Sequence, residues 1–233
     1  MCFSTGASFG AGVILSVIGV ASIKKANKSS QIIFAGIPLI FCVQQVTEGF
    51  VWLSLSNPAF SSLEQVATYT FIFIAQVIWP IWIPIALLML EEENRRKKIQ
   101  KVLLGMGVVI SLFLAYCLLN FHVEAKIIGY HIKYQQDYPR QLSRIGALFY
   151  IIATIAPTFV SAYKRMWILG VAVLISYIIT TIFYVEYITS VWCFFASIIS
   201  IAVYIILHEI IRGKKDHTPA EMAALRIRIK YRF

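Results

Sequence analysis

The sequence predicts an all-α integral membrane protein, a bundle of seven transmembrane helices formed by residues 1–211. Hydrophobic residues make up 59% of the chain and charged residues only 14%, proportions that exclude an ordinary soluble domain. Seven apolar segments approach or exceed the ~20 helical residues that cross the hydrocarbon core. The alternating pattern of a membrane β-barrel is absent, and lipid favours helices because they pair their own backbone groups. The seven segments are residues 3–23, 31–53, 66–90, 102–121, 145–163, 166–185 and 187–207.

The distribution of basic residues predicts the orientation of the bundle. Of the 21 Lys and Arg residues, 17 fall in alternate connections on one side or after residue 207. The other side carries Lys126, Lys133, Arg140 and Arg144. Because basic connections stay in the cytoplasm, the amino terminus is expected outside, and residues 212–233 form a basic cytoplasmic tail of a protein of the cell inner membrane. The net charge of +10 then reflects topology, and no nucleic acid is expected as a partner.

The first segment carries small residues at helical spacing. Ser8, Gly12 and Ser16 recur every four residues, which predicts close packing against another helix. Cys2 precedes them at the outer end of the predicted bundle. It has two interpretations: a buried or disulfide-bonded thiol, or, after removal of the initiator Met, an amino-terminal nucleophile with its own amine as base.

The second segment contains the one formal charge within a predicted span, Glu48. On a helix, Gln45, Glu48 and Trp52 share a face, and Gln44 adjoins Glu48. A carboxylate at the centre of a membrane helix costs roughly 2.5–3.5 kcal/mol, so this face is expected to look into the bundle and to find a partner there. Pro38 predicts a kink before the polar face.

The third segment combines Gln76 and Trp79 with two prolines one turn apart, Pro80 and Pro84. The prolines leave the carbonyl groups of Gln76 and Pro80 without helical donors, so other groups must satisfy them. This segment is either a kinked wall of the cavity that Glu48 faces or a distorted packing helix.

Several of these motifs together resemble a known family. They are Met1-Cys2-Phe3-Ser4 with Ala7-Ser8-Phe9, Pro38-Leu39, Gln44-Gln45, Glu48-Gly49, Val51-Trp52, and Trp79-Pro80 with Trp82 and Pro84. In this order they resemble a family of small multi-pass membrane proteins, mainly bacterial, known as a domain of unknown function. The resemblance covers residues 1–98, and beyond them only the hydropathy is similar. It implies that these polar and aromatic positions belong together, and it implies no activity.

The connections and later segments add polar groups at both ends. Residues 91–98 read as a solvated, charged helical extension. In the outer connection 122–144, Tyr130, Ile132 and Tyr134 alternate with basic residues, which indicates either a short strand that caps the cavity or an interfacial aromatic belt. Tyr184, Glu186 and Trp192 are expected at the same outer end.

The sequence excludes several specific functions. The last segment, 187–207, has no lysine for a retinal Schiff base, and the spans lack the histidine pairs that hold haem. No P-loop, dinucleotide fingerprint or metal-binding spacing occurs, and no cofactor is indicated.

Three hypotheses for the function remain. In the first, a receptor-like or carrier-like protein binds a small polar or cationic ligand or a lipid headgroup in an outward-facing pocket centred on Glu48. In the second, a membrane-embedded enzyme acts on lipids or amphiphiles with Cys2 as nucleophile or Glu48 as general base. In the third, the chain is an accessory subunit with a membrane-protein partner, and its surface rather than its cavity is functional. The alternative to a pocket at Glu48 is a purely structural network of buried Gln and Glu. Membrane lipids are partners in each. The expected ligand-binding residues are Gln45, Glu48, Trp52, Gln76, Trp79, Tyr184, Glu186 and Trp192.

Overall fold

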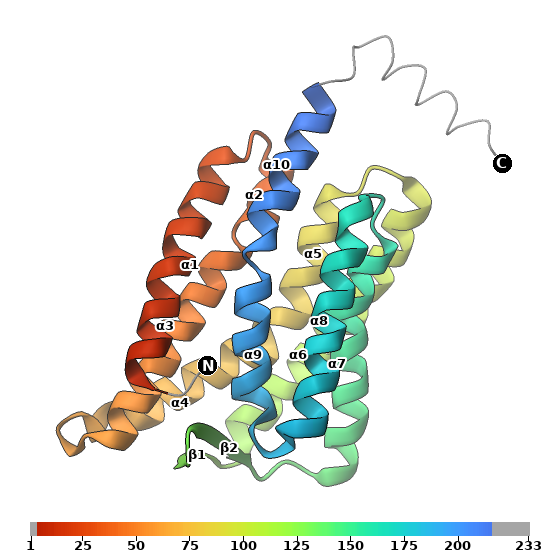
Figure 1. Cartoon of the computed structure of the whole chain (residues 1–233). Helices are drawn as coiled ribbons and strands as arrows, with labels where there is room; N and C mark the ends of the chain where they lie inside the picture. Colours follow the sequence, from red (N-terminus) through yellow and green to blue (C-terminus); the bar gives the residue numbers. More distant parts are fainter. Residues whose placement is uncertain (1–3, 216–233) are drawn as a thin grey trace.

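The computed structural model describes residues 4–215, apart from the side chains of residues 140–144 and 213–215. Cys2 and residues 216–233 of the predicted tail lie outside the described residues. The chain forms a helical bundle with a two-stranded hairpin at one end (Figure 1). The elements are α1 (Thr5–Lys25), α2 (Ser29–Ala35), α3 (Ile37–Ser56), η1 (Pro58–Leu63), α4 (Glu64–Phe73), η2 (Ile74–Ile78), α5 (Trp79–Leu90), α6 (Asn94–Asn120), β1 (Val123–Ile128), β2 (His131–Gln136), α7 (Arg140–Val160), α8 (Lys164–Phe183), η3 (Val185–Tyr187), α9 (Ile188–Ile199) and α10 (Ala202–Lys215).

Within the described residues, six helical segments are long and apolar enough to cross a membrane, which makes the chain a multi-pass membrane protein. They match six of the seven predicted segments. The other predicted segment, 145–163, falls in α7, whose apolar part Ile145–Val160 is shorter than the six. The six segments are Thr5–Lys25, Ser29–Ser56, Pro58–Leu90, Asn94–Asn120, Lys164–Phe183 and Val185–Arg212.

Two of the long segments are irregular near their prolines. The second segment breaks at Gly36, between α2 and α3, and Pro38 lies in the first turn of α3, where its missing N–H is tolerated. In the third segment the π-helical stretch η2 directly precedes Trp79 and Pro80. Such π-helical turns inside α-helices are frequent at functional sites.

Small residues of α1 pack closely against α3. A Cβ atom placed on Gly12 would lie 2.7 Å from Cγ2 of Val46, and one on Gly19 would lie 2.5 Å from the Leu39 side chain. Ser8 and Gly12 of the predicted ridge are buried, and Ser16 is half-buried. The ridge therefore contributes to helix packing, as expected for small residues in membrane helices.

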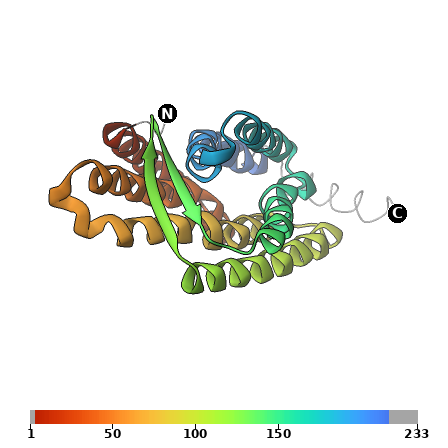
Figure 2. The ribbon, with the colours of Figure 1, turned by 90° about the horizontal axis from the view of Figure 1, so that it is seen from below.

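The predicted fold class, all-α, does not include the two-stranded hairpin of the described residues, although a short strand was one of the two interpretations of the connection 122–144. β1 and β2 pair antiparallel, and Gly129, with φ of 61°, opens a two-residue turn of the type that matches strand twist. The hairpin lies across the end of the bundle that also carries η1 and η3, called the hairpin end below (Figure 2). Ile132 is fully buried there with Val51 and Trp52, so the hairpin covers the ends of α3 and α4.

Candidate functional site

The polar face of α3 is entirely inside the bundle. The exposed fractions of Gln44, Gln45 and Glu48 are all 0%. The Ser190 hydroxyl of α9 donates a hydrogen bond of 2.6 Å to Oε1 of Glu48. A polar group within a membrane span is thus matched by a partner on another helix, as its cost requires.

Trp79 joins α5 to this face. Its indole Nε1 donates a buried hydrogen bond of 2.8 Å to Oε1 of Gln44, and its ring stacks on Phe41 with 4.0 Å between centroids. Trp79 and Gln44 thus position α5 against α3 through one directional bond and one ring contact. The structure brings Trp79 to the polar face through Gln44.

Other predicted residues of α3 keep unused hydrogen-bonding capacity. Neither amide atom of Gln45, nor the indole Nε1 of Trp52, has a hydrogen-bond partner within the described part of the chain. Both groups are buried, and buried polar groups of proteins are normally hydrogen-bonded. Trp52 lies beneath the hairpin in the cluster that contains Ile132.

The proline-interrupted segment receives its donors from other helices. The Ser111 hydroxyl of α6 donates to the carbonyl of Val77 at 2.7 Å, and the Tyr150 hydroxyl of α7 donates to the carbonyl of Ala75. A Cβ atom on Gly107 of α6 would lie 1.9 Å from the Pro80 carbonyl oxygen, so only glycine fits this approach. The irregular backbone is buried against α6 and α7, which is where such backbone is tolerated at membrane depth.

Gln76 links the same segment to the hairpin end. Its Nε2 donates to Oε1 of Gln136 on β2 at 2.9 Å, and the Tyr138 hydroxyl donates to its Oε1 at 3.4 Å. Burial raises the pKa of Tyr138, with Cys117 and Tyr69 adding to the shift, so this hydroxyl stays protonated as a donor.

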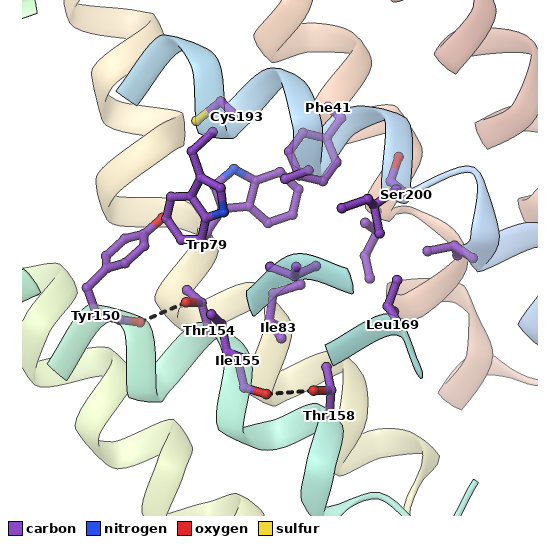
Figure 3. A pocket seen from close by; sticks show the side chains of 16 residues that line it. Phe41, Trp79, Ile83, Tyr150, Thr154, Ile155, Thr158, Leu169, Cys193 and Ser200 are labelled. Carbon is purple, nitrogen blue, oxygen red and sulfur yellow. Dashed lines mark hydrogen bonds between the residues drawn. The ribbon is translucent and has the colours of Figure 1, made fainter. Parts of the chain in front are cut away.

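A narrow cavity of about 80 Å³ runs between α5, α7, α8 and α9 (Figure 3). Its lining is apolar and aromatic, and the hydroxyl groups of its two threonines bond to carbonyls of their own helix. Thr154 donates to the Tyr150 carbonyl at 2.8 Å, and Thr158 donates to the Ile155 carbonyl at 2.6 Å, so neither needs a ligand. Residues that line it include Phe41, Trp79, Ile83, Tyr150, Leu169 and Ala196.

A wide cavity of about 210 Å³ adjoins the narrow one toward the hairpin end. Tyr150, Trp192 and Cys193 line both cavities. The wide cavity also has a polar part, to which Gln76, Gln136 and Tyr138 contribute. Apolar walls with a few placed polar groups are typical of small-molecule sites.

The eight predicted binding residues therefore fall into three groups. Trp79, Gln76 and Trp192 line the cavities. Gln45, Glu48 and Trp52 are buried in α3 and are not among the residues that line either cavity. Tyr184 and Glu186 contact the hairpin: the His131 ring lies 5.3 Å from that of Tyr184, and Lys133 forms a 2.9 Å ion pair with Glu186.

Several lining residues were not singled out from the sequence. Gln136 lies in a hairpin whose pairing brings it beside Gln76, 60 positions away in the chain. Tyr150 and Cys193 lie in predicted spans with an almost uniformly apolar sequence, which does not show which side of the helix faces the interior of the bundle. Cys117 and Cys193 are both free thiols.

No group of three or more His, Cys, Asp or Glu residues that could hold a metal ion occurs in the described part of the chain. No curated protein and no solved structure matches the sequence. Residues 1–220 match the model of a family of unknown function, DUF6629. The match spans all the helices and the hairpin, and the chain therefore belongs to this family of unknown function.

Proposed function

We propose that the protein binds a small or single-chain amphiphile of the membrane, as a receptor-like or carrier-like binder. One observation carries this proposal: a narrow apolar cavity meets a wider cavity with amide and phenol groups, and both share Tyr150, Trp192 and Cys193. An engineered apolar cavity of about 150 Å³ binds benzene, so this pair has room for more than a single ring. Its polarity suits a ligand with an apolar tail and a polar end.

The position of the polar groups agrees with such a ligand. Gln136 and Tyr138 belong to the hairpin end, whereas Ser200 and Val203 line the narrow cavity roughly 15 Å further along α9 and α10. An amphiphile in this site has its polar end near the membrane surface and its tail at greater depth.

We place the hairpin end at the outer face of the cell inner membrane and the carboxyl-terminal tail in the cytoplasm. The excess of Lys and Arg at the opposite connections supports this orientation. α7 is then the seventh crossing, which makes the two termini lie on opposite sides.

Glu48 has a positioning role in this proposal. Its bond to Ser190 fixes α9 two residues before Trp192 and three before Cys193, which line both cavities. Gln44 does the same for Trp79. The polar face that the sequence places at the centre then holds the cavity walls without touching the ligand.

Native mass spectrometry of the protein in mild detergent tests the binding. Ala196→Phe should fill the narrow cavity and remove a retained amphiphile, whereas Ile198→Phe, on the exposed face of the same helix, should leave it bound. An unchanged adduct in Ala196→Phe, or no adduct in the unaltered protein after incubation with single-chain amphiphiles, would overturn the proposal and favour an accessory subunit.

A further inference from the structure

The polar part of the wide cavity presents hydrogen-bond donors in a fixed direction. Tyr138 donates to Oε1 of Gln76, and Nε2 of Gln76 donates to Oε1 of Gln136. Each amide in this relay is oriented by its neighbour, since an amide has one acceptor end and one donor end. The relay therefore ends on Nε2 of Gln136, a donor.

That final donor has no partner within the described residues. Nε2 of Gln136 is buried and makes no hydrogen bond with another described group. The indole Nε1 of Trp192, which lines the same cavity, is likewise buried and without an acceptor among them. A buried unsatisfied donor costs about 1–3 kcal/mol, so two in one cavity indicate that an acceptor belongs there.

The lining also restricts the charge of that acceptor. No Asp, Glu, Lys, Arg or His is among the residues that line either described cavity. A cation would meet two N–H donors and no carboxylate, so aromatic faces alone would have to hold it. An anion would find two neutral donors but no counter-charge among the lining residues, and a buried charge without a partner is costly.

We infer that the polar end of the ligand is a neutral carbonyl group, as in an ester, whose oxygen accepts hydrogen bonds from Nε2 of Gln136 and Nε1 of Trp192. This inference rests on the proposed binding of an amphiphile. Tyr150 and Tyr177 support the Trp192 ring edge-to-face at 5.8 and 5.1 Å, so the second donor is also held in place.

Three probes with the same alkyl chain test the recognition of the carbonyl: methyl decanoate, decyl methyl ether and decyltrimethylammonium. Their affinities are measured by titration in native mass spectrometry, with thermal stabilisation as a second readout. Methyl decanoate should bind the unaltered protein about five- to thirtyfold more tightly than the ether, the effect of two neutral hydrogen bonds, and more tightly than the cation.

Two variants connect this preference to the donors. Gln136→Leu and Trp192→Phe should each lower the ester-over-ether preference by about two- to fivefold, because each removes one of the two N–H donors, and the double variant should reduce the preference to about one. Gln135→Leu on the exposed side of β2 and Trp167→Phe on the exposed face of α8 are the matched controls and should retain it. Trp192→Phe keeps the test decisive if Gln136→Leu disturbs the hairpin.

The outcomes separate this inference from the proposed function. Equal binding of ester and ether that Ala196→Phe still abolishes would overturn carbonyl recognition and leave the amphiphile site standing. Preferential binding of the cation would likewise overturn it. If the three probes bind Ala196→Phe as tightly as the unaltered protein, they do not occupy the cavity, and the proposed function itself is overturned.

Discussion

The Ser190 hydroxyl and the Glu48 carboxyl group form a fully buried hydrogen bond of 2.6 Å that links α9 to α3. The two residues lie 142 positions apart in the chain. Because Trp192 and Cys193 lie two and three residues further along α9, this contact helps to position two residues that line both cavities.

Ser190→Ala should lower the stability of the bundle by about 1–3 kcal/mol, since it removes the hydroxyl donor from a buried acceptor. It should also weaken amphiphile binding through displacement of Trp192. Thermal unfolding in detergent and native mass spectrometry measure the two effects. Ser197→Ala is the control, because Ser197 is buried on the same helix but bonds only to the Phe194 carbonyl in its own turn. Equal losses in both variants would contradict a specific role for the Glu48 contact.

Gly107→Ala should be strongly destabilising. The added Cβ would lie 1.9 Å from the Pro80 carbonyl oxygen, a backbone atom that cannot rotate away, and overpacking of this kind costs about 1–3 kcal/mol or more. Thermal unfolding measures the loss.

Gly105→Ala on the same helix provides the comparison. No atom lies within 4 Å of its added Cβ, so this variant should be neutral or slightly stabilising through the higher helix propensity of alanine, by up to about 1 kcal/mol. A similar response of the two variants would show that α6 does not approach Pro80 as closely as the structure has it.

The hydropathy of the chain predicted most of the membrane segments, and local chemistry predicted their irregularities. Pro38 predicted a kink, and the second segment breaks at Gly36. Pro80 and Pro84 predicted that the carbonyls of Gln76 and Pro80 need outside donors, whereas the outside donors of this segment bond to the carbonyls of Ala75 and Val77. The identity of those donors was not predictable: Ser111 and Tyr150 reach η2 only because α6 and α7 pack beside it. Contacts between transmembrane helices depend on how each helix is rotated about its own axis. The sequence of a uniformly apolar helix carries little information on that rotation.

The hairpin and the charge run of residues 91–98 show two further limits of prediction from the sequence. Period-2 alternation in residues 130–134 left two interpretations open, a strand or an aromatic belt. The structure shows a strand, which pairs with β1 and buries Ile132 in the cluster that contains Trp52. Residues 91–98 were expected to be solvated, but Glu91 is 3% exposed and bonds to backbone N–H groups. A charge run does not show which of its members folds back onto a neighbouring connection.

Glu91→Ala should destabilise the end of the bundle opposite the hairpin. One carboxylate oxygen accepts from the Ala162 backbone N–H at 2.9 Å and the other from Glu92 and Glu93, so the variant leaves these donors without their acceptor. A loss of about 1–3 kcal/mol is expected in thermal unfolding. Glu92→Ala, at an exposed neighbour, should cost much less, and an equal cost would contradict this clamp on the α7–α8 connection.

The proposed orientation predicts the labelling of single cysteines in a chain whose own cysteines are replaced. Tyr130→Cys, at the exposed hairpin turn, should react with a membrane-impermeant maleimide in intact cells. Asn94→Cys, at the other end of the bundle (Figure 1), should react only after permeabilisation. The reverse pattern would place the hairpin end in the cytoplasm and overturn the orientation.

Docking of the hairpin should weaken in acid because of His131. The ring stacks on Tyr187 at 4.7 Å, and burial lowers the pKa of His131 below its ordinary value of 6.5. The docked state therefore binds this proton less readily than the undocked state. Docking is fully stable above about pH 6.5, loses stability as the pH falls through that value, and stops losing it below the depressed pKa of the docked state.

Amide hydrogen exchange of residues 123–136, normalised to the intrinsic rate at each pH, measures this change. Protection should fall between pH 7.5 and about pH 5 in the unaltered protein. His131→Gln removes the titrating ring and should show flat protection over the same range. If the variant loses protection in parallel with the unaltered protein, another group is responsible, and the role of His131 in the docking of the hairpin is contradicted.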